Sequence, residues 1–480
     1  MAGWRRILPL VVAVSLAAGP AMVSAAAQAK PPRATAGAAA TAKPGTRAIR
    51  PGLDQIQHIV VIYLENHSFD NLFGNFPGAN GLAHAGKAVI QLDKDGDTYK
   101  TLPPVLDPSQ TPPIPDGRFP LLLSNQPFLI DQYVSQDAKF PSPVHLYYHE
   151  IAQIDGGKMD KFVAYADVGA LVMGYQDGSK LALWNYAKEY VLADHFFHAA
   201  FGGSFLNHFW TICACTPRYG NAPDSIRATL DDKGNFIKDG QVTPDGYAVN
   251  TMQPVFQPHS PKITDPTLLL PPQTQKTIGD ELSDKNISWA WYSGGWNDAL
   301  AGKASADFQF HHQPFAYFAK YGDGTEARKK YLRDESDLIT DLAKDRLPSV
   351  VFWKPIGGLN EHPGYADTAS GDKHMAEMVE RIRRSKAWSS TVIIVTYDEN
   401  GGFWDHMPPP KGDRWGPGSR VPTVIISPFA KRHTVDHTLY DTTSILKLIE
   451  TRYGLPPLGD RDAKANNLTK ALDLTVAPRG

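Results

Sequence analysis

Acidic and amide side chains directly follow two short apolar segments of this 480-residue chain. Asp398 and Glu399 come after one segment, and Glu65 and Asn66 come after the other. Carboxylate and amide oxygens are the ligands that hard divalent cations prefer in proteins. The four residues therefore predict one metal site for Ca²⁺, Mg²⁺, Mn²⁺ or Zn²⁺, although each alone is typical of a helix cap or a surface charge.

A serine on a glycine-rich turn is the candidate nucleophile. Ser204 follows Gly202 and Gly203 and precedes an apolar stretch, which predicts a serine at the N-terminal end of a helix. Free backbone N–H groups and the helix dipole favour an anion such as phosphate there. A serine whose hydroxyl pKa is lowered by a metal can attack phosphorus, whereas the alternative is a serine that only caps the helix. Asn207, one turn later, is predicted to donate a hydrogen bond to a phosphoryl oxygen.

Histidines in the predicted loops form the third candidate group. Imidazoles bind phosphate oxygens when protonated, or protonate a leaving group. The catalytic candidates among the 16 histidines are His145, His311, His312 and His362. A single histidine is more often structural, and the sequence leaves His406 open between the two roles.

The two cysteines and one arginine are expected to be structural. Cys213 and Cys215 are separated by one residue, a spacing that strains a mutual disulfide, so two buried thiols are predicted. Arg420 lies before an apolar segment and is expected to support a turn rather than bind substrate.

Strands of a parallel sheet must position these side chains. Residues 58–64 and 391–397 are short, β-branched and mostly apolar, as is typical of strands buried on both faces of a parallel sheet. Ligands of open α/β sheets lie outside the carboxyl ends of such strands. Further strands are predicted at 190–194, 287–292, 349–354 and 421–427, and helices at 181–190, 277–284, 331–345, 373–385 and 442–452. The alternation predicts an α/β fold with a large, mostly parallel central sheet flanked by helices, and with loop-rich insertions.

The N-terminal segment is predicted to be a targeting signal. Residues 1–25 combine an Arg-Arg pair, an apolar stretch and a small-residue cleavage site, which predicts a signal peptide, with a twin-arginine signal or an uncleaved membrane anchor as alternatives. Residues 26–52 are rich in Ala and Pro and are predicted to be a linker. One catalytic domain is expected over 53–475, with a peripheral insertion at 217–276.

Charge and hydropathy limit the partners. The formal net charge is −2, from 48 basic and 50 acidic residues, so the composition does not favour a nucleic-acid partner. No segment after the N-terminal one approaches 18 consecutive apolar residues. The chain is therefore expected in the periplasm or secreted, without stable membrane insertion once the signal is removed.

Several motifs together resemble the secreted bacterial phosphoesterases that group phospholipase C with acid phosphatases, within the alkaline-phosphatase-like superfamily. The matching stretches are 58–74, 156–160, 194–197, 397–410 and 441–446. The resemblance implies an alkaline-phosphatase-like core, with Ser204 as covalent nucleophile. It implies a metal held by Glu65, Asn66, Asp398 and Glu399, and a phosphate surrounded by His145, His311, His312 and His362.

One departure from the phospholipase branch shapes the expected activity. That branch usually shows Gly-Pro-Thr-x-Pro-Asn-Arg at the nucleophile, whereas residues 202–208 read Gly-Gly-Ser-Phe-Leu-Asn-His. This segment, the pair His311-His312 and residues 360–365 look more like the acid phosphatase branch. The expected activity is therefore hydrolysis of small phosphate monoesters through a phosphoserine. The alternatives are a phospholipase C acting on phosphatidylcholine-like diesters and a non-catalytic exported protein that binds metal or phosphate.

Overall fold

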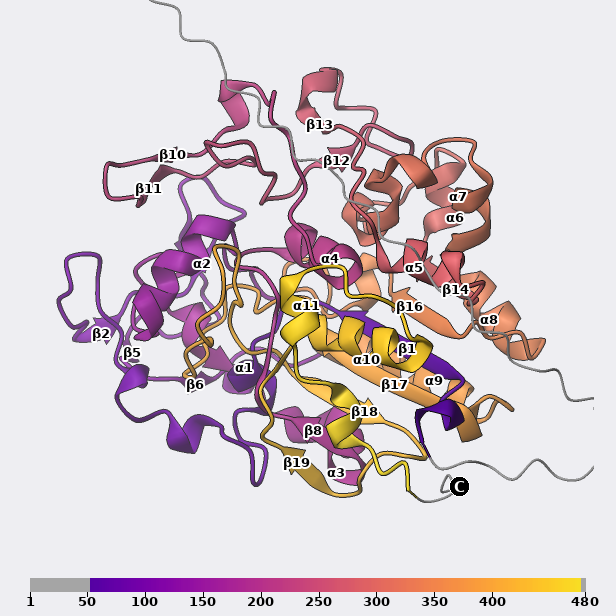
Figure 1. Cartoon of the computed structure of the whole chain (residues 1–480). Coiled ribbons are helices and arrows are strands. Elements are labelled where there is room, and N and C mark those ends of the chain that lie inside the picture. The colour runs from indigo at the N-terminus through magenta and orange to yellow at the C-terminus, as the bar shows by residue number, and fades with distance from the viewer. Residues whose placement is uncertain (1–51, 476–480) are drawn as a thin grey trace, which may run out of the picture. The chain divides into compact units, whose positions relative to one another are not determined.

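An eight-stranded sheet is the main element of the computed structural model, which describes residues 52–475 (Figure 1). Five of its seven strand pairings are parallel and two are antiparallel, so the predicted mostly parallel sheet is confirmed. In spatial order its strands are β15 (Leu332–Asp334), β14 (Trp289–Ser293), β16 (Val350–Lys354), β1 (His58–Leu64), β17 (Thr391–Tyr397), β18 (Thr423–Ile426), β8 (Val191–Ala193) and β19 (Thr434–Asp436). The predicted signal peptide and residues 26–51 of the predicted linker lie outside the described residues.

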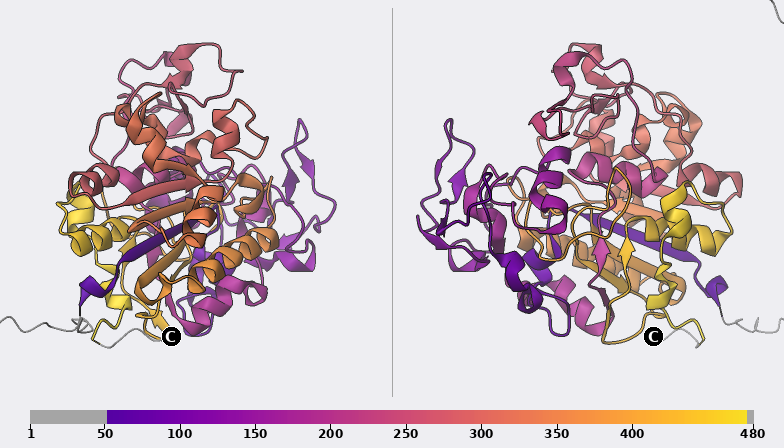
Figure 2. Two further views of the ribbon diagram at one scale, coloured as in Figure 1. Left: turned by 90° about the vertical axis from the view of Figure 1, so that its right-hand side faces the viewer. Right: turned by 60° about the vertical axis from the view of Figure 1, so that its left-hand side comes forward.

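Helices cover the sheet, which explains why its strands are apolar on both faces. Every residue of β14, β16 and β17 is buried. Figure 2 shows the sheet between α10 on one side and α9 on the other. The helices are α1 (Phe69–Phe73), α2 (Tyr147–Ile154), α3 (Ala182–Glu189), α4 (Ser204–Cys213), α5 (Ile278–Asp284), α6 (Trp296–Leu300), α7 (Glu326–Tyr331), α8 (Glu335–Ala343), α9 (Thr368–Arg383), α10 (Thr443–Tyr453) and α11 (Asp460–Lys464). None of these helices in residues 52–475 is long and apolar enough to cross a membrane.

Small two-stranded sheets occupy the loop-rich parts of the chain. Two of them lie within 217–276, the segment predicted as an insertion. The pairs are β2 (Thr101–Leu102) with β5 (Leu123–Ser124), β3 (Leu106–Asp107) with β4 (Ile114–Pro115), β6 (Phe128–Leu129) with β7 (Gly174–Tyr175), β9 (Phe196–Phe197) with β20 (Tyr440–Asp441), β10 (Thr229–Leu230) with β11 (Phe236–Lys238), and β12 (Gln253–Pro254) with β13 (Leu269–Leu270).

The register of β1 and β17 brings the two predicted metal-binding segments together. The strands pair in parallel over seven residues, and the last pair is Leu64 with Tyr397. Glu65 and Asp398 are therefore the next residues on adjacent strands, and both leave the sheet at its carboxyl edge.

The helix predicted over 331–345 is wrong in its first part. Residues 332–334 form β15, in which Leu332 pairs with Trp291 at the edge of the sheet. Asp334 then caps α8 by accepting a hydrogen bond from the backbone N–H of Ser336. Pairing with β14 and a strong N-cap therefore outweigh the amphipathic pattern.

The predicted pair of free thiols is also wrong, because Cys213 and Cys215 form a disulfide. α4 ends at Cys213, and Ala214 adopts a left-handed conformation with a φ of 45°. This turn places the two Cα atoms 5.1 Å apart, within the range that disulfides require. The left-handed turn at Ala214 therefore makes a disulfide possible despite the short spacing.

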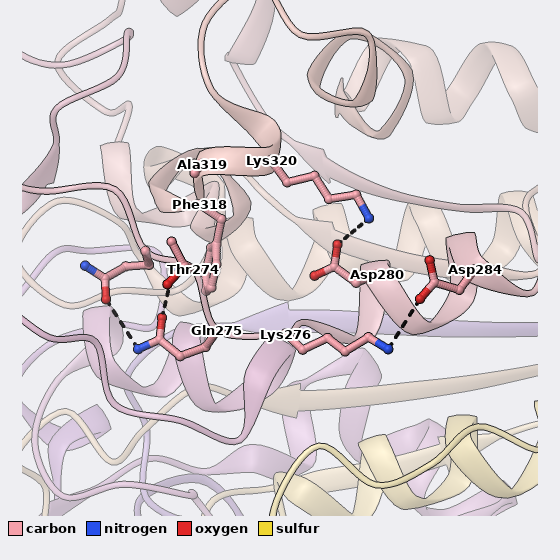
Figure 3. A pocket seen from close by; sticks show the side chains of 9 residues that line it. Thr274, Gln275, Lys276, Asp280, Asp284, Phe318, Ala319 and Lys320 are labelled. Atoms are coloured by element: carbon pink, nitrogen blue, oxygen red, sulfur yellow. Dashed lines mark hydrogen bonds and ion pairs between the residues drawn. The ribbon is translucent and has the colours of Figure 1, made fainter.

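A cavity of about 350 Å³ beside α5 is lined by charges that already have partners (Figure 3). Lys320 Nζ lies 2.5 Å from Asp280 Oδ1, and Lys276 Nζ lies 3.3 Å from Asp284 Oδ2. None of the predicted site residues lines this cavity.

A buried carboxyl group on α10 makes stability depend on pH. Burial, and then the neighbouring Asp462 carboxylate, raise the pKa of Glu450 to about 9. A raised carboxyl pKa contributes stability below its unfolded value, and that contribution is lost as the pH rises through the folded value. We expect Glu450→Gln to be more stable than the natural chain by on the order of 1–4 kcal/mol at pH 8, and by much less at pH 4.

Thermal unfolding from pH 4 to pH 9 checks this expectation for Glu450. Glu377→Gln is the matched control, because Glu377 is exposed on α9. A stability difference for Glu450→Gln that does not change with pH would contradict the assignment.

Candidate active site

Ser204 is the first residue of α4, as predicted, and is 5% exposed. The preceding turn requires glycine. Gly202 has a φ of 83°, and a Cβ there would lie 2.5 Å from the backbone nitrogen of Tyr147. The sequence Gly-Gly-Ser therefore lets the chain pass close to α2 and then present the Ser204 hydroxyl at a helix N-terminus.

The side-chain amide of Asn207 forms hydrogen bonds with the backbone of this turn. Its Oδ1 accepts a hydrogen bond from Ala200 N at 2.9 Å. Its Nδ2 donates to the carbonyl oxygens of Ala200 and Gly202 at 3.0 and 3.1 Å. The amide is fully buried and its hydrogen bonds go to the backbone of the turn, so a contact of Asn207 with a phosphoryl oxygen stays a prediction.

The structure brings Ser204 into contact with both predicted metal-binding segments. Ser204 Oγ lies 3.3 Å from Asn66 Oδ1 and 3.4 Å from Glu399 Oε1. Asn66 has a φ of 65°, and a Cβ at Gly401 would lie 2.4 Å from the Asn66 carbonyl oxygen. Because Gly401 has no side chain, the loop after β17 can pass close to the loop after β1.

A lysine that the sequence predicts only as the last residue of a strand lies at the centre of the site. Lys354, the last residue of β16, is fully buried. Its Nζ lies 2.8 Å from Glu65 Oε1 and 3.3 Å from Asp398 Oδ2. Because β1 separates β16 from β17 in the sheet, Lys354 reaches across the end of β1 and links two of the predicted metal ligands.

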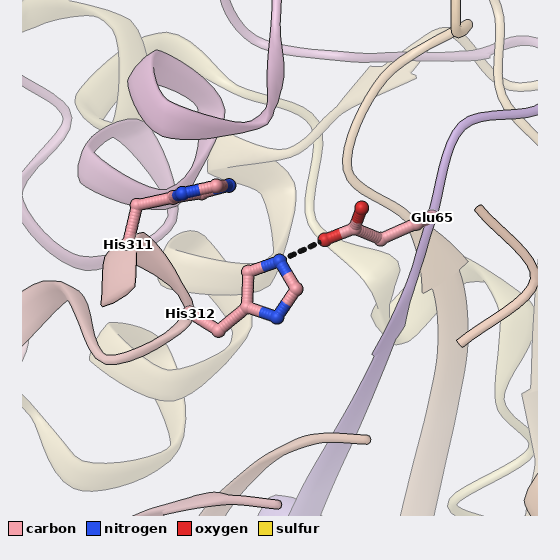
Figure 4. A group of neighbouring side chains, drawn as sticks. All are labelled: Glu65, His311 and His312. Carbon is pink, nitrogen blue, oxygen red and sulfur yellow. Dashed lines mark ion pairs between the residues drawn. The ribbon is translucent and has the colours of Figure 1, made fainter. Parts of the chain in front are cut away.

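Glu65 is also surrounded by histidines and a tyrosine. Figure 4 shows the His312 ring directed at the Glu65 carboxylate, with which it forms an ion pair, and the His311 ring beside it. Tyr365 OH donates to Glu65 Oε2 at 3.1 Å, and His362 Nε2 lies 3.7 Å from the same oxygen. The tyrosine was missed by sequence reasoning, although it lies within 360–365.

Four histidines near the carboxylates fall into two groups by the exposure of their side chains. The side chains of His145 and His362 are 22% and 11% exposed, whereas those of His312 and His208 are 2% and 0% exposed. His145 Nε2 lies 3.7 Å from Glu399 Oε1. His145 and His362 are therefore open to an entering molecule, whereas His312 and His208 lie behind the carboxylates.

His208 is a further residue that sequence reasoning did not select. Its Nδ1 lies 2.6 Å from the Ser204 carbonyl oxygen and 3.8 Å from Asp398 Oδ2. Its Nε2 is buried and has no hydrogen-bond partner. Its i,i+4 spacing from Ser204 on a predicted helix was the available signal, because such residues share one helix face.

The three buried carboxyl groups have too few positive neighbours for all of them to be ionised easily. His312 and Lys354 outweigh the effect of burial and hold the pKa of Glu65 well below its usual range. Burial raises the pKa of Asp398 to about 7 despite the attraction of Lys354. Burial, and then the charge of Asp398, raise the pKa of Glu399 well above its usual range. Three buried carboxylates beside one lysine thus form a site that fits an additional cation.

Lys354 is expected to stabilise the buried carboxylates with which it pairs. We expect Lys354→Met to destabilise the cation-free protein by roughly 3 kcal/mol, because it leaves buried carboxylates without their partner. Added Mn²⁺ should then raise the melting temperature more in the variant than in the natural chain. Thermal unfolding with chelator and with Mn²⁺ measures both effects.

A matched control for Lys354→Met is Lys344→Met, which removes an exposed lysine just after α8. Equal Mn²⁺-induced shifts in the natural chain and in Lys354→Met would contradict the role of Lys354.

Arg420 and His406 belong to a neighbouring structural network. Arg420 is fully buried, as expected of a structural arginine, and its guanidinium lies 2.8 Å from Asp405 Oδ1 and 3.2 Å from Asp70 Oδ1. His406 Nδ1 lies 2.6 Å from Asp70 Oδ2, and its Nε2 lies 3.2 Å from Asn80 Oδ1. The network fixes the loop after Glu399, and it gives His406 the structural role that the sequence had left open.

Comparison with known proteins identifies the family to which this arrangement belongs. The Phosphoesterase family model matches residues 56–456. Phospholipase C A of Mycobacterium tuberculosis is 26% identical over 475 residues, which cover 89% of this chain and 79% of that protein. A non-hemolytic phospholipase C of Pseudomonas aeruginosa is 23% identical and covers 88% of this chain and 58% of that protein.

Among solved structures, an alkaline phosphatase superfamily protein from Vibrio parahaemolyticus matches with a TM-score of 0.34 and 10% identity, covering 69% of this chain and 71% of that one. The predicted family is confirmed by the family match, whereas the acid phosphatase branch stays a prediction. A match over this span, together with phospholipase C relatives aligned along most of the chain, makes this protein a member of the Phosphoesterase family and a hydrolase of phosphoester bonds.

Proposed function

We propose that this chain is a metal-dependent phosphodiesterase of the phospholipase C type, with Ser204 as its nucleophile. The main support for the proposal is the position of Ser204 Oγ at the start of α4, within 3.4 Å of both Asn66 Oδ1 and Glu399 Oε1. The relatives named phospholipase C support the diester substrate. This choice departs from the monoester activity expected from the sequence.

Four residues would hold the divalent cation, namely Glu65, Asn66, Asp398 and Glu399. Their oxygen donors suit Ca²⁺, Mg²⁺ or Mn²⁺, and carboxylates also bind Zn²⁺. The three carboxyl groups gathered in one buried place and the unpartnered His208 Nε2 support a cation here. Bound at this position, the cation would lower the pKa of the serine hydroxyl and offset charge on the phosphoryl oxygens.

The chain's own residues then divide the reaction into two steps. Ser204 Oγ bonds to phosphorus while the bond from phosphorus to the alcohol oxygen breaks, and the proton lost by the serine is balanced by the one that the leaving alcohol oxygen takes up. The serine then carries the remaining phosphoryl group as an ester. A water oxygen next bonds to phosphorus, the bond from phosphorus to Ser204 Oγ breaks, and a proton of that water restores the hydroxyl. We assign His145 and His362 to contacts with the substrate because they are the more exposed imidazoles, and burial lowers the pKa of both. Neutral imidazoles can accept or donate one hydrogen bond without an added charge.

A phosphate monoesterase is the second candidate, and the nucleophile segment favours it. Residues 202–208 lack the proline-containing pattern of the phospholipase branch, and they resemble the acid phosphatase branch. Both activities would use the same nucleophile, so only the substrate distinguishes them.

Parallel assays on matched leaving groups distinguish the candidates. We expect kcat/KM on p-nitrophenyl phosphorylcholine to exceed kcat/KM on p-nitrophenyl phosphate by at least ~10-fold, which corresponds to about 1.4 kcal/mol of transition-state stabilisation. Phosphatidylcholine vesicles should also release phosphocholine. The reverse preference would favour the monoesterase, and retained metal with no hydrolysis of any ester would favour a binding protein.

We also propose that the protein acts outside the cytoplasm, in the periplasm or after secretion. Arg5, Arg6 and the apolar stretch 7–23 support an exported chain. N-terminal sequencing of protein recovered from the periplasm and medium should find a start near residue 26. A chain that retains residue 1 in the cytoplasm would contradict export.

A further inference from the structure

A second cluster of metal-ligating side chains lies at the carboxyl edge of the sheet, outside the active site. It consists of Asp194, His195 and His437, whose ligand atoms all lie within 4.8 Å of one another. The reaction described above uses none of the three. We propose that they form a separate site for a zinc-like divalent ion.

Strand register explains how the cluster forms. β8 and β19 run parallel, and Ala193 pairs with Asp436. Asp194 and His437 are the next residues on the two strands, so they leave the sheet side by side, and His195 follows Asp194. β8 runs in the same direction as β17 because β18 between them is antiparallel to both. The cluster therefore shares the carboxyl edge with the active site but is displaced from it by two strands.

Hydrogen bonds within the cluster and from outside it hold its side chains in place. The backbone N–H of Asn80 donates to Asp194 Oδ2 at 2.7 Å. His437 Nδ1 lies 2.9 and 3.0 Å from the two carboxylate oxygens. His195 Nε2 lies 4.0 Å from Asp194 Oδ1, and a hydrogen bond to the His437 backbone also engages the His195 ring. The Asn80 N–H is an outer hydrogen bond of the kind that orients carboxylate ligands in protein metal sites, whereas a bound ion would replace the direct contact between His437 and Asp194.

The spacing and exposure of the ligands suit an ion that enters from solvent. Ligand atoms of a tetrahedral zinc site lie about 3.3 Å apart, since Zn–N and Zn–O bonds are about 2.0–2.2 Å long. The Asp194 carboxylate lies 2.9 Å from His437 Nδ1 and 4.0 Å from His195 Nε2, on either side of this value, and all three ligand atoms lie within 4.8 Å of one another. The side chain of Asp194 is 0% exposed, that of His195 is 20% exposed and that of His437 is 58% exposed. The buried carboxylate anchors the ion, while the exposed side leaves room for water as a fourth ligand.

The donor set also predicts selectivity between the two sites. Two imidazole nitrogens and one carboxylate oxygen favour Zn²⁺, Co²⁺ or Ni²⁺ over Mg²⁺ or Ca²⁺. The proposed catalytic site offers mainly oxygen donors. The two sites are therefore expected to respond differently to added Mg²⁺.

The second site is connected to the loop that follows the predicted metal ligands. Asn80 Nδ2 lies 3.3 Å from His195 Nε2, and Asn80 Oδ1 lies 3.2 Å from His406 Nε2. His406 is part of the network with Asp70 and Arg420. An ion at Asp194 would thus hold β8, β19 and the loop containing Asn80 together, which is a structural role rather than a step of the reaction.

Zinc titration of the full chain tests the proposal. Chelator-treated Asp398→Asn protein, in which the catalytic site is weakened, is titrated with Zn²⁺ by calorimetry, and bound zinc is counted by elemental analysis after dialysis. We expect one zinc per chain that excess Mg²⁺ does not displace. Adding His437→Ala, a change at an exposed side chain, should weaken this binding by at least 10-fold, and so should His195→Ala.

His433→Ala is the matched control, because His433 is an exposed histidine next to the other end of β19. It should keep the bound zinc. In an otherwise natural chain, His437→Ala should retain hydrolysis of the phosphoester substrates. Zinc binding that is equal in His437→Ala and His433→Ala, or binding that is weak and without fixed stoichiometry in both, would overturn the site, whatever the outcome at Asp398.

Discussion

Replacing Ser204 by alanine is expected to lower kcat by at least ~10³-fold on every phosphoester substrate, because the change removes the proposed nucleophile. The Ser204 side chain is small and 5% exposed. Its hydroxyl contacts groups of the site, namely Asn66, Glu399 and Asp398. The fold should therefore survive, with an unchanged circular dichroism spectrum and a melting temperature within a few degrees of the natural chain.

A covalent readout separates a nucleophile from a residue that merely shapes the site. Acid quenching during turnover of p-nitrophenyl phosphorylcholine should trap a peptide that carries phosphorylcholine on Ser204, detected by mass spectrometry. The adduct should be absent from Ser204→Ala and present in Ser305→Ala, which changes an exposed loop serine. An adduct that persists in Ser204→Ala, or full activity of that variant, would refute the assignment.

The pairing of the two acidic segments is the part of the site that the sequence reveals most directly. Each segment follows an apolar, β-branched run, and parallel neighbours in a sheet end at the same edge. The structure pairs β1 and β17 over their whole length, which places Glu65 beside Asp398. No comparable rule positions Ser204, which approaches Asn66 from 138 residues along the chain and Glu399 from 195 residues along the chain.

The disulfide and the contacts of Asn207 share a physical cause, since both depend on local backbone geometry that a linear pattern does not encode. The left-handed conformation of Ala214 makes the disulfide feasible. The tight turn at 200–203 uses up the amide of Asn207. Lys354 was visible as a lysine that ends an apolar strand, and a buried strand end is where a lone charge needs a partner. A lysine at the end of a buried strand was therefore a signal in the sequence that Lys354 belongs to the site.

Replacing Asp398 by asparagine should abolish activity while leaving the cation-free protein at least as stable. We expect a loss in kcat of at least ~10³-fold, because a neutral amide weakens the proposed cation site that activates Ser204. Asparagine has the shape of aspartate, and it keeps an acceptor oxygen for the Glu399 backbone N–H, which lies 2.9 Å from Asp398 Oδ1. The loss should therefore reflect charge rather than packing.

The pH dependence of stability distinguishes this loss of charge from damage to the fold. Burial raises the pKa of Asp398 to about 7, so in the cation-free natural chain its favourable contribution is present at low pH and is lost as the pH rises through 7. Asparagine cannot ionise, so Asp398→Asn should match the natural chain near pH 4 and be more stable at pH 8. Mn²⁺ at 100 times its Kd should stabilise the natural chain by about 2.7 kcal/mol and the variant by much less.

The control for Asp398→Asn is Asp298→Asn, the same chemical change at an exposed residue of α6. It should keep both activity and the Mn²⁺-induced rise in melting temperature. Suppose instead that Asp398→Asn remained active and kept the full response to Mn²⁺. The buried carboxyl groups would then be neutralised by protons rather than by a cation. Because Lys354 already pairs with Glu65 and Asp398, this outcome would make Ser204 a nucleophile activated by the protein alone.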